Sequence, residues 1–171
     1  MPFLWSVRPQ GRTSSGHRGL NKLTALLDEL GVQVDAQLFE LAFTHRSFAF
    51  EHGRIPSNER LEFLGDAVLQ IVVTEHIFTS FPNLAEGQLA KLRASVVSSH
   101  ALAEVARELH LGELIRLGQG EINTAGADKT SILADTMEAV IGAIHISCGA
   151  VASSRFVHAL LDERIASSEL Q

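Results

Sequence analysis

The stretch from Asn58 to Leu69, Asn-Glu-Arg-Leu-Glu-Phe-Leu-Gly-Asp-Ala-Val-Leu, separates charged and apolar residues onto different sides of a helix. Each helical residue turns about 100° from the one before, so Glu59, Glu62 and Asp66 fall within an arc of roughly 60°. The opposite side carries four apolar residues, Leu61, Leu64, Val68 and Val72. This division predicts a helix with one side buried in a core and three carboxylates on the other.

Phe63 departs from that division because it lies only about 40° from Glu59, on the carboxylate side. An aromatic ring outside the apolar face of its own helix needs another surface to bury it. An acidic helix face by itself is most often an ordinary solvated surface, and that interpretation holds unless other acids accompany it.

A second helix, predicted over residues 131–144, repeats this plan. Asp135 and Glu138 lie on one side of it, together with Gly142. The other side is apolar and consists of Leu133, Met137, Val140 and Ile144. Glycine destabilises a helix relative to alanine, so Gly142 beside the acids predicts that another element approaches closely there.

The composition favours one folded domain, because 171 residues can bury a substantial core and 46% are hydrophobic against 20% charged. Helical periodicity recurs along the chain while strand patterns are weak, so we expect an all-α helical bundle. The single cysteine excludes an internal disulfide framework and favours a reducing, cytoplasmic location. No uninterrupted apolar run reaches the roughly 18 residues of a membrane span.

Three segments are expected along the chain. Residues 1–19 contain prolines, glycines and arginines but no acid, which predicts a flexible basic N-terminal arm. Residues 20–165 carry the helical pattern, and residues 166–171 are expected to be a C-terminal tail or the start of a linker. Asn83 and Glu86 have capping-box spacing, which gives Glu86 a purely structural alternative role.

Two further features have competing interpretations. His45 could be a ligand or a general base, but no cysteine or second histidine lies at metal-ligand spacing, which favours a hydrogen-bonded structural histidine. Residues 116–130 form the longest irregular stretch, and long loops inside compact domains commonly carry function. Their glycines do not have the spacing of a phosphate-binding loop.

The acids of the two helices would converge if the helices packed side by side. Glu62, Asp66, Asp135 and Glu138 would then repel one another unless they were protonated or bridged by cations. Ligand sets made only of oxygen suit Mg²⁺ or Mn²⁺, and water bound to such an ion can attack a phosphodiester. A metal-dependent nuclease centre is therefore compatible with the net charge of -6, which argues against a simple basic nucleic-acid binder.

The segment Asn58–Leu69 resembles the signature of the ribonuclease III endonuclease domain. Four companion segments also resemble that family and occur in its order: Thr44-His-Arg-Ser47, Glu86-Gly-Gln-Leu-Ala90, Lys91-Leu-Arg-Ala94 and Ser131-Ile-Leu-Ala-Asp-Thr-Met-Glu138. The resemblance covers roughly residues 20–165.

The resemblance implies an all-α endonuclease domain that acts as a homodimer on double-stranded RNA. By the same resemblance, Mg²⁺ would be held by Glu62, Asp135 and Glu138, Asp66 would join Glu138 in catalysis, and Mn²⁺ could substitute. Two further positions, Glu59 and Glu86, match auxiliary acids of the family. Phe63 matches the aromatic residue that inserts into a socket on the partner subunit.

The implied reaction is hydrolysis of both strands, as in rRNA and mRNA processing, leaving 5′-phosphate and 3′-hydroxyl ends with a short 3′ overhang. Bacterial members of the family usually continue into a C-terminal double-stranded-RNA-binding domain. This sequence ends at Gln171 without one, as expected either of a catalytic-domain fragment or of a natural short form. Two alternatives remain: a catalytically silent relative that binds RNA or the ribosome, and a helical interaction protein with a solvated acidic face. A silent relative is expected to lose its acids, and all six are present.

Overall fold

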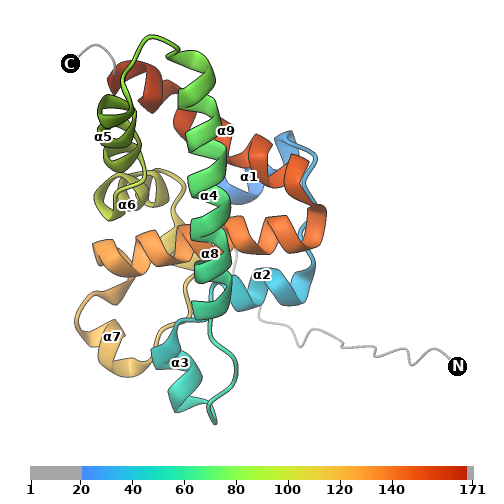
Figure 1. The fold of residues 1–171 in the computed structure, drawn as a ribbon. Helices are drawn as coiled ribbons and strands as arrows, with labels where there is room; N and C mark the ends of the chain where they lie inside the picture. Colours follow the sequence, from blue (N-terminus) through green and yellow to red (C-terminus); the bar gives the residue numbers. More distant parts are fainter. Residues whose placement is uncertain (1–20, 169–171) are drawn as a thin grey trace, which may run out of the picture.

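The computed structural model describes residues 21–168, and these residues form an assembly of helices (Figure 1). The helices in chain order are α1 (Lys22–Glu29), α2 (Ala36–Ala42), α3 (Arg46–Glu51), α4 (Glu59–Ser80), α5 (Glu86–Val96), α6 (Ser99–Glu108), η1 (Leu111–Leu114), α7 (Gln119–Asn123), η2 (Gly126–Asp128), α8 (Thr130–Cys148) and α9 (Ala150–Ser168). In this part of the chain, β structure is limited to one isolated bridge between Thr44 and Arg116. The predicted all-α class is confirmed.

Two predicted segments meet the limits of the described residues differently. The predicted basic arm, residues 1–19, lies outside them. At the other end, α9 continues to Ser168, so the boundary predicted at residue 165 falls inside that helix.

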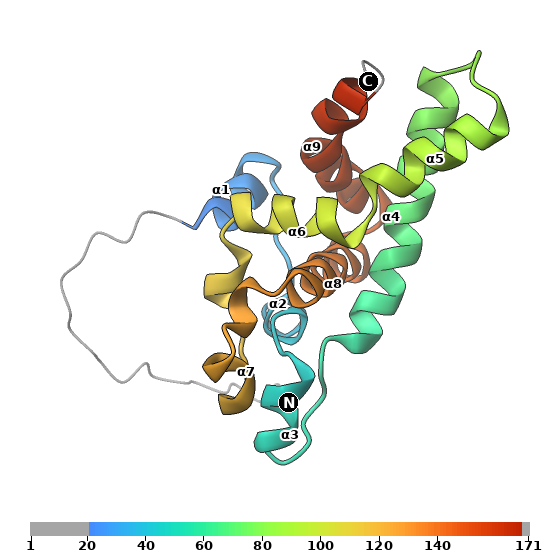
Figure 2. The ribbon, with the colours of Figure 1, turned by 90° about the vertical axis from the view of Figure 1, so that its left-hand side faces the viewer.

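The centre of the fold is the crossing of α4 and α8, which Figures 1 and 2 show from two sides. Leu69 and Val73 of α4 are fully buried there, as are Met137 and Ile141 of α8. The other helices pack around this pair, with α6 and α9 against α8 and α9 also against α4. By length and hydropathy α8 could cross a membrane, but 61% of that stretch is buried inside the domain, as expected for a core helix.

Two glycines allow the backbones of α4 and α8 to meet. A Cβ atom at Gly65 would lie 1.7 Å from the carbonyl oxygen of Glu138, and one at Gly142 would lie 2.3 Å from that of Leu61. Both distances are far below van der Waals contact, so no side chain fits at either position. The close approach predicted at Gly142 is therefore made by α4.

The ends of several helices follow the sequence signals. The carboxylate of Asp35 accepts hydrogen bonds from the backbone N–H groups of Gln37 and Leu38, which caps α2 as predicted. Gly31 ends the first helix with a φ of +66°, a conformation that glycine adopts without strain. The predicted Asn83–Glu86 capping box is wrong, because α5 begins after Ala85.

Gln88 makes the capping contact of α5 in place of Glu86. Its side-chain oxygen accepts a hydrogen bond from the backbone N–H of Ala85 at 3.0 Å. A glutamine can take this role as well as a glutamate, and the loop before α5 brings Ala85 rather than Asn83 to the first turn. Glu86 therefore has no capping role.

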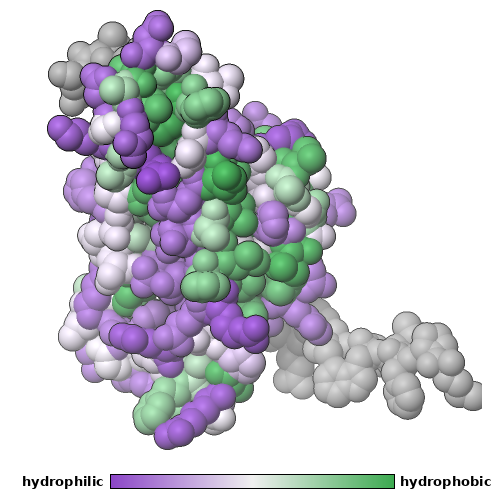
Figure 3. Space-filling model, in the orientation of Figure 1, coloured by the Kyte–Doolittle hydropathy of each residue, from purple (hydrophilic) through white to green (hydrophobic). Residues whose placement is uncertain are grey.

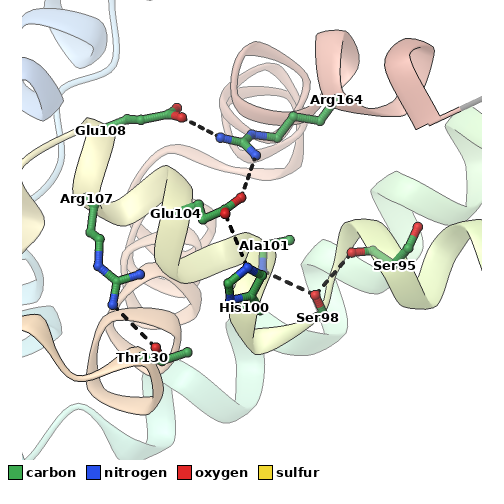
Figure 4. A network of polar contacts seen from close by, with 9 residues as sticks. All are labelled: Ser95, Ser98, His100, Ala101, Glu104, Arg107, Glu108, Thr130 and Arg164. Carbon is green, nitrogen blue, oxygen red and sulfur yellow. Dashed lines mark hydrogen bonds and ion pairs between the residues drawn. The ribbon is translucent and has the colours of Figure 1, made fainter. Parts of the chain in front are cut away.

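Ion pairs on the surface join α6 to its neighbours (Figure 4). Arg164 of α9 contacts Glu104 at 3.2 Å and Glu108 at 2.6 Å. Arg107 donates to the carboxylate of Asp128 at 2.7 Å and to the hydroxyl of Thr130 at 3.3 Å. These contacts fix α6 against α9 and against the start of α8.

The glycine contact gives a direct test of the packing. We expect Gly65→Ala to lower the free energy of unfolding by about 3 kcal/mol or more, because the added methyl group collides with the backbone of α8. Gly87→Ala is the control, since Gly87 is exposed inside α5 with open space around it; it should be neutral or stabilising by up to about 1 kcal/mol. Urea unfolding of the two variants measures both values, and equal effects would contradict the close crossing.

Candidate metal centre

Three carboxylates from the two central helices converge at the crossing. One side-chain oxygen from each of Glu62, Asp135 and Glu138 lies within 4.8 Å of the other two. Glu62 stands one turn before Gly65, whose backbone touches that of Glu138. The close helix contact therefore brings three of the four acids that were expected to converge, Glu62, Asp135 and Glu138, into one group.

The remaining acids predicted for the site take different positions. Asp66 is exposed on the next turn of α4, accepts a hydrogen bond from Gln70 at 3.3 Å, and lies near enough for its charge to raise the pKa of Glu138. Glu59 accepts a hydrogen bond from Ser57 at 2.7 Å, and its charge raises the pKa of Glu62. Both acids border the cluster.

Glu86 does not join the other acids within this chain. It opens α5 and lines a separate cavity of about 180 Å³ beside Phe78 and Arg93. Phe78 belongs to the last turns of α4, whereas Glu62 belongs to its first turn, so nearly the whole helix separates them. The sequence around Glu86 carries no signal that could have shown its distance from the carboxylate cluster.

The pKa values show how unfavourable the cluster is without a cation. The pKa of Glu138 is raised from 4.5 to about 8, first by burial and then by the charges of Asp66, Asp135 and Glu62. Burial also raises the pKa of Glu62, followed by the charges of Asp135 and Glu59. Burial raises the pKa of Asp135 as well, against the opposing charges of His45 and Arg46. The site disfavours the charged form of all three acids that converge there.

The cluster forms no direct ion pair with a protein cation in the described residues, although the charges of His45 and Arg46 oppose the rise that burial causes in the pKa of Asp135. Among residues 21–168, none of the ion pairs involves Glu59, Glu62, Asp66, Asp135 or Glu138. Buried carboxylates without partners are costly, and an oxygen-only set of this kind suits a hard divalent cation. The oxygen ligands and the absence of direct ion pairs to these acids in the described residues therefore fit Mg²⁺ or Mn²⁺.

The cluster opens into a cleft of about 340 Å³. Its lining comprises His45, Arg46, Asn58, Glu59, Glu62, Glu121, Lys129, Ser131, Ile132 and Asp135. The cleft is thus built from the start of α3, the start of α4, α7, the loop before α8 and the first turns of α8. Acids and bases are both present around it.

His45 has the structural role that the sequence favoured and also lies in the cleft. Its Nδ1 accepts a hydrogen bond from the backbone N–H of Ser47 at 3.2 Å and caps α3, so the structural interpretation holds. The ring also lines the cleft, and burial lowers its pKa. A lowered pKa favours the neutral imidazole near neutral pH.

Sequence reasoning missed Glu121 and Lys129 as individual cleft residues. The ammonium group of Lys129 lies 2.6 Å from the Glu121 carboxylate, and this hydrogen bond lowers the pKa of Glu121. The available signal was the long stretch 116–130, which was expected to carry function. It is more ordered than expected, since it contains α7 and η2.

The face carrying α4 exposes patches of hydrophobic side chains among polar ones (Figure 3). Phe63 is 82% exposed, next in sequence to the cluster residue Glu62. Ile71 on α4 and Val151 on α9 are also exposed, at 55% and 76%, and both line a groove of about 440 Å³. The predicted position of Phe63, outside the core of its own chain, is thus observed.

The amino-acid sequence matches the Ribonuclease-III-like family over residues 35–164. The chain belongs to the ribonuclease III family. The match includes α2 to α8 completely and with them the carboxylate cluster, the cleft and the crossing of α4 and α8.

Individual members of the family show how far the similarity extends. The chain is 57% identical over 145 residues to ribonuclease 3 of Streptomyces coelicolor, covering 85% of this chain and 52% of that protein. It is 54% identical over 139 residues to ribonuclease 3 of Thermobifida fusca, covering 81% and 58%. The chain therefore spans little more than half the length of these relatives.

The fold of the chain is similar to that of a solved nuclease domain. The nuclease domain of ribonuclease III from Campylobacter jejuni is 41% identical, with a TM-score of 0.74. The aligned region covers 81% of this chain and 94% of that domain. The similarity thus extends over almost the whole of a ribonuclease III nuclease domain.

The raised pKa of Glu138 has a consequence for stability. Glu138 binds a proton more tightly when folded, so its favourable contribution is complete below about pH 4.5 and is lost as the pH rises through about 8. Without metal, Glu138→Gln should therefore become increasingly more stable than the natural chain across that window, with a constant difference above it. Thermal unfolding in a chelator at several pH values measures the difference, and a pH-independent difference would contradict the raised pKa.

Proposed function

We propose that this domain is a Mg²⁺-dependent endoribonuclease that hydrolyses double-stranded RNA. The observation that carries the proposal is the cluster of Glu62, Asp135 and Glu138, which forms no ion pair within the described residues and lies beside an open cleft in a member of the ribonuclease III family. The proposed products carry 5′-phosphate and 3′-hydroxyl ends with short 3′ overhangs. Processing of rRNA and mRNA in the cytoplasm is the proposed setting.

The acids of the proposed active site have three different proposed roles. Glu62, Asp135 and Glu138 would hold Mg²⁺, with Mn²⁺ as a substitute, and Asp66 would join Glu138 as a catalytic residue. When bound, the ion supplies positive charge for the phosphate oxygens and lowers the pKa of attacking water. Glu59, at the edge of the cleft, is proposed as an auxiliary acid.

Two basic side chains of the cleft suit an RNA backbone. Arg46 is exposed and forms no ion pair within the described residues, and Lys129 forms its ion pair at the rim. Phosphate contacts of this kind position a duplex without reading its sequence, as is usual for double-stranded RNA. These residues offer local positive charge in a chain whose net charge is -6.

We also propose that the domain acts as a homodimer through the exposed face of α4. A phenylalanine that is 82% exposed is unfavourable in a monomer, and the groove beside Ile71 and Val151 offers further apolar surface for burial. The nuclease domain from C. jejuni has a region involved in dimer formation. Glu86, remote from the cluster in its own chain, is proposed as an auxiliary acid of the dimer.

A catalytically silent, RNA-binding relative is the second candidate function. No ion pair offsets the cluster among the described residues, and this argues against a silent relative, because partly buried carboxylates that hold no cation would only lower stability. All six acids are present, including the three that converge. The enzymatic function is therefore the better supported one.

Glu138→Gln tests the proposed activity. The substitution preserves size while removing one metal ligand, so cleavage of a long RNA duplex in Mg²⁺ should fall by at least about 1,000-fold, which corresponds to roughly 4 kcal/mol of barrier. Duplex binding in Ca²⁺ should change little, because the cluster is not needed for contacts to the RNA backbone. A gel assay of product ends, together with a binding titration, measures both quantities.

Glu163→Gln is the matched control, since Glu163 is exposed on α9 and its side chain forms no ion pair in the described part of the chain. It should cleave like the natural chain. Undiminished cleavage by Glu138→Gln would refute the metal-ligand assignment. A natural chain that binds duplex RNA but never cuts it, in Mg²⁺ or Mn²⁺, would favour the silent relative.

The dimer proposal is tested by Phe63→Ala. Removing the exposed ring should weaken self-association by at least tenfold, since burial of an aromatic side chain at an interface commonly contributes more than about 1.4 kcal/mol. Ile122→Ala is the control because Ile122 is also an exposed apolar residue, at 55%, but belongs to α7. Sedimentation equilibrium measures both variants, and an unchanged dimer in Phe63→Ala would exclude the proposed contact.

A further inference from the structure

A second group of metal-binding side chains lies away from the carboxylate cluster. His76 belongs to the last third of α4, and His158 and Asp162 belong to α9. One potential ligand atom from each of the three lies within 4.8 Å of the others. His76 stands fourteen positions after Glu62 in α4, which places the two groups about 21 Å apart along the helix axis.

The geometry centres on the carboxylate of Asp162. Its Oδ1 lies 2.8 Å from Nδ1 of His158 and 3.9 Å from Nε2 of His76. The two imidazole rings meet edge to face, with 5.1 Å between their centroids. The side chains of His76, His158 and Asp162 are 25%, 38% and 46% exposed, so an ion from solvent can reach them.

We propose that His76, His158 and Asp162 form a binding site for Zn²⁺ or a similar transition-metal ion. Imidazole nitrogen together with one carboxylate oxygen suits zinc, whereas the oxygen-only cluster suits magnesium. Zinc binds such ligands at about 2.0–2.2 Å, so its ligand atoms lie roughly 3–4 Å from one another. The two separations at Asp162 are close to that range, and solvent can complete the coordination.

A histidine–carboxylate hydrogen bond alone does not account for the group. Such a bond explains the contact between His158 and Asp162, which stand four residues apart on one helix. It does not explain His76, whose side chain makes no hydrogen bond among the described residues although its Nε2 lies 3.9 Å from the same oxygen. Within those residues Asp162 also lacks an arginine or lysine partner, so its charge is available to a cation.

The pair formed by His100 and Glu104 on α6 provides an internal comparison. It has the same four-residue spacing, with 3.2 Å between Nε2 and the carboxylate oxygen. Arg164 already forms an ion pair with Glu104 (Figure 4). Among the described residues, His100 and Glu104 belong to no group of three potential metal ligands. His100 and Glu104 therefore form, within the described part of the chain, a histidine–carboxylate pair without the two features that we propose to bind metal, a second histidine and a carboxylate that no arginine contacts.

Metal at this group would join the end of α4 to the last helix. The start of α4 carries the carboxylate cluster, and its middle carries part of the exposed apolar face. The proposed ion would thus be structural: it would resist separation of α4 from α9 without entering the reaction.

The test is calorimetric titration of the full chain, free of any histidine tag, with Zn²⁺ in excess Mg²⁺, which keeps zinc from the oxygen-only cluster. We expect one equivalent to bind and to raise the midpoint of thermal unfolding. His76→Gln, His158→Gln and Asp162→Asn should each weaken binding by more than about 100-fold, since loss of an outer-shell partner alone costs roughly 10–100-fold. His100→Gln should bind like the natural chain.

A spectroscopic measurement on the natural chain identifies the ligands without substitution. Zn²⁺ should shift the imidazole ¹⁵N resonances of His76 and His158, while those of His100 remain unchanged. Three results would overturn the proposal: no binding of Zn²⁺ in excess Mg²⁺, unchanged affinity in His76→Gln, or loss of zinc binding in Glu138→Gln but not in the histidine variants. None of these results depends on RNA cleavage.

Discussion

The direct backbone contact between α4 and α8 is the constraint on which the candidate active site depends. Gly65 and Gly142 leave no side chain between the helices, so each backbone lies against the carbonyl groups of the other. Because the two backbones are in contact, the acids on the adjoining turns are also brought close to one another. Glu62 and Glu138 are therefore held together by the packing of the apolar core and by the absence of two Cβ atoms, rather than by any attraction between themselves.

This arrangement sets core packing against electrostatics. Burial of the apolar sides of α4 and α8 favours the crossing, while burial of the carboxylates raises their pKa values and opposes it. A divalent cation bound to the carboxylates would offset the cost of burying them without altering the packing. Sites that conflict with local stability are commonly functional, and the conflict here coincides with the region matched to a nuclease family.

The sequence by itself determined the helices and the chemistry of their faces. Periodicity distinguished the apolar side of α4 from its acidic side and placed Phe63 with the acids, because a helix has a fixed angle per residue. Short-range signals located the N-terminal cap of α2 at Asp35 and the end of α1 at Gly31, because the backbone groups that define each helix end lie within a few residues of them. The family followed from motifs that are also local.

Only the tertiary structure decided which faces meet, because distances between separate helices depend on packing and loop paths that periodicity does not encode. It paired Gly65 with Gly142, put Glu86 beside the far end of α4, and brought Lys129 to the cleft. It also joined His76 to a histidine and an acid more than 80 residues later in the chain. Local spacing can show that a helix carries ligands, but it cannot show which other helix completes the set.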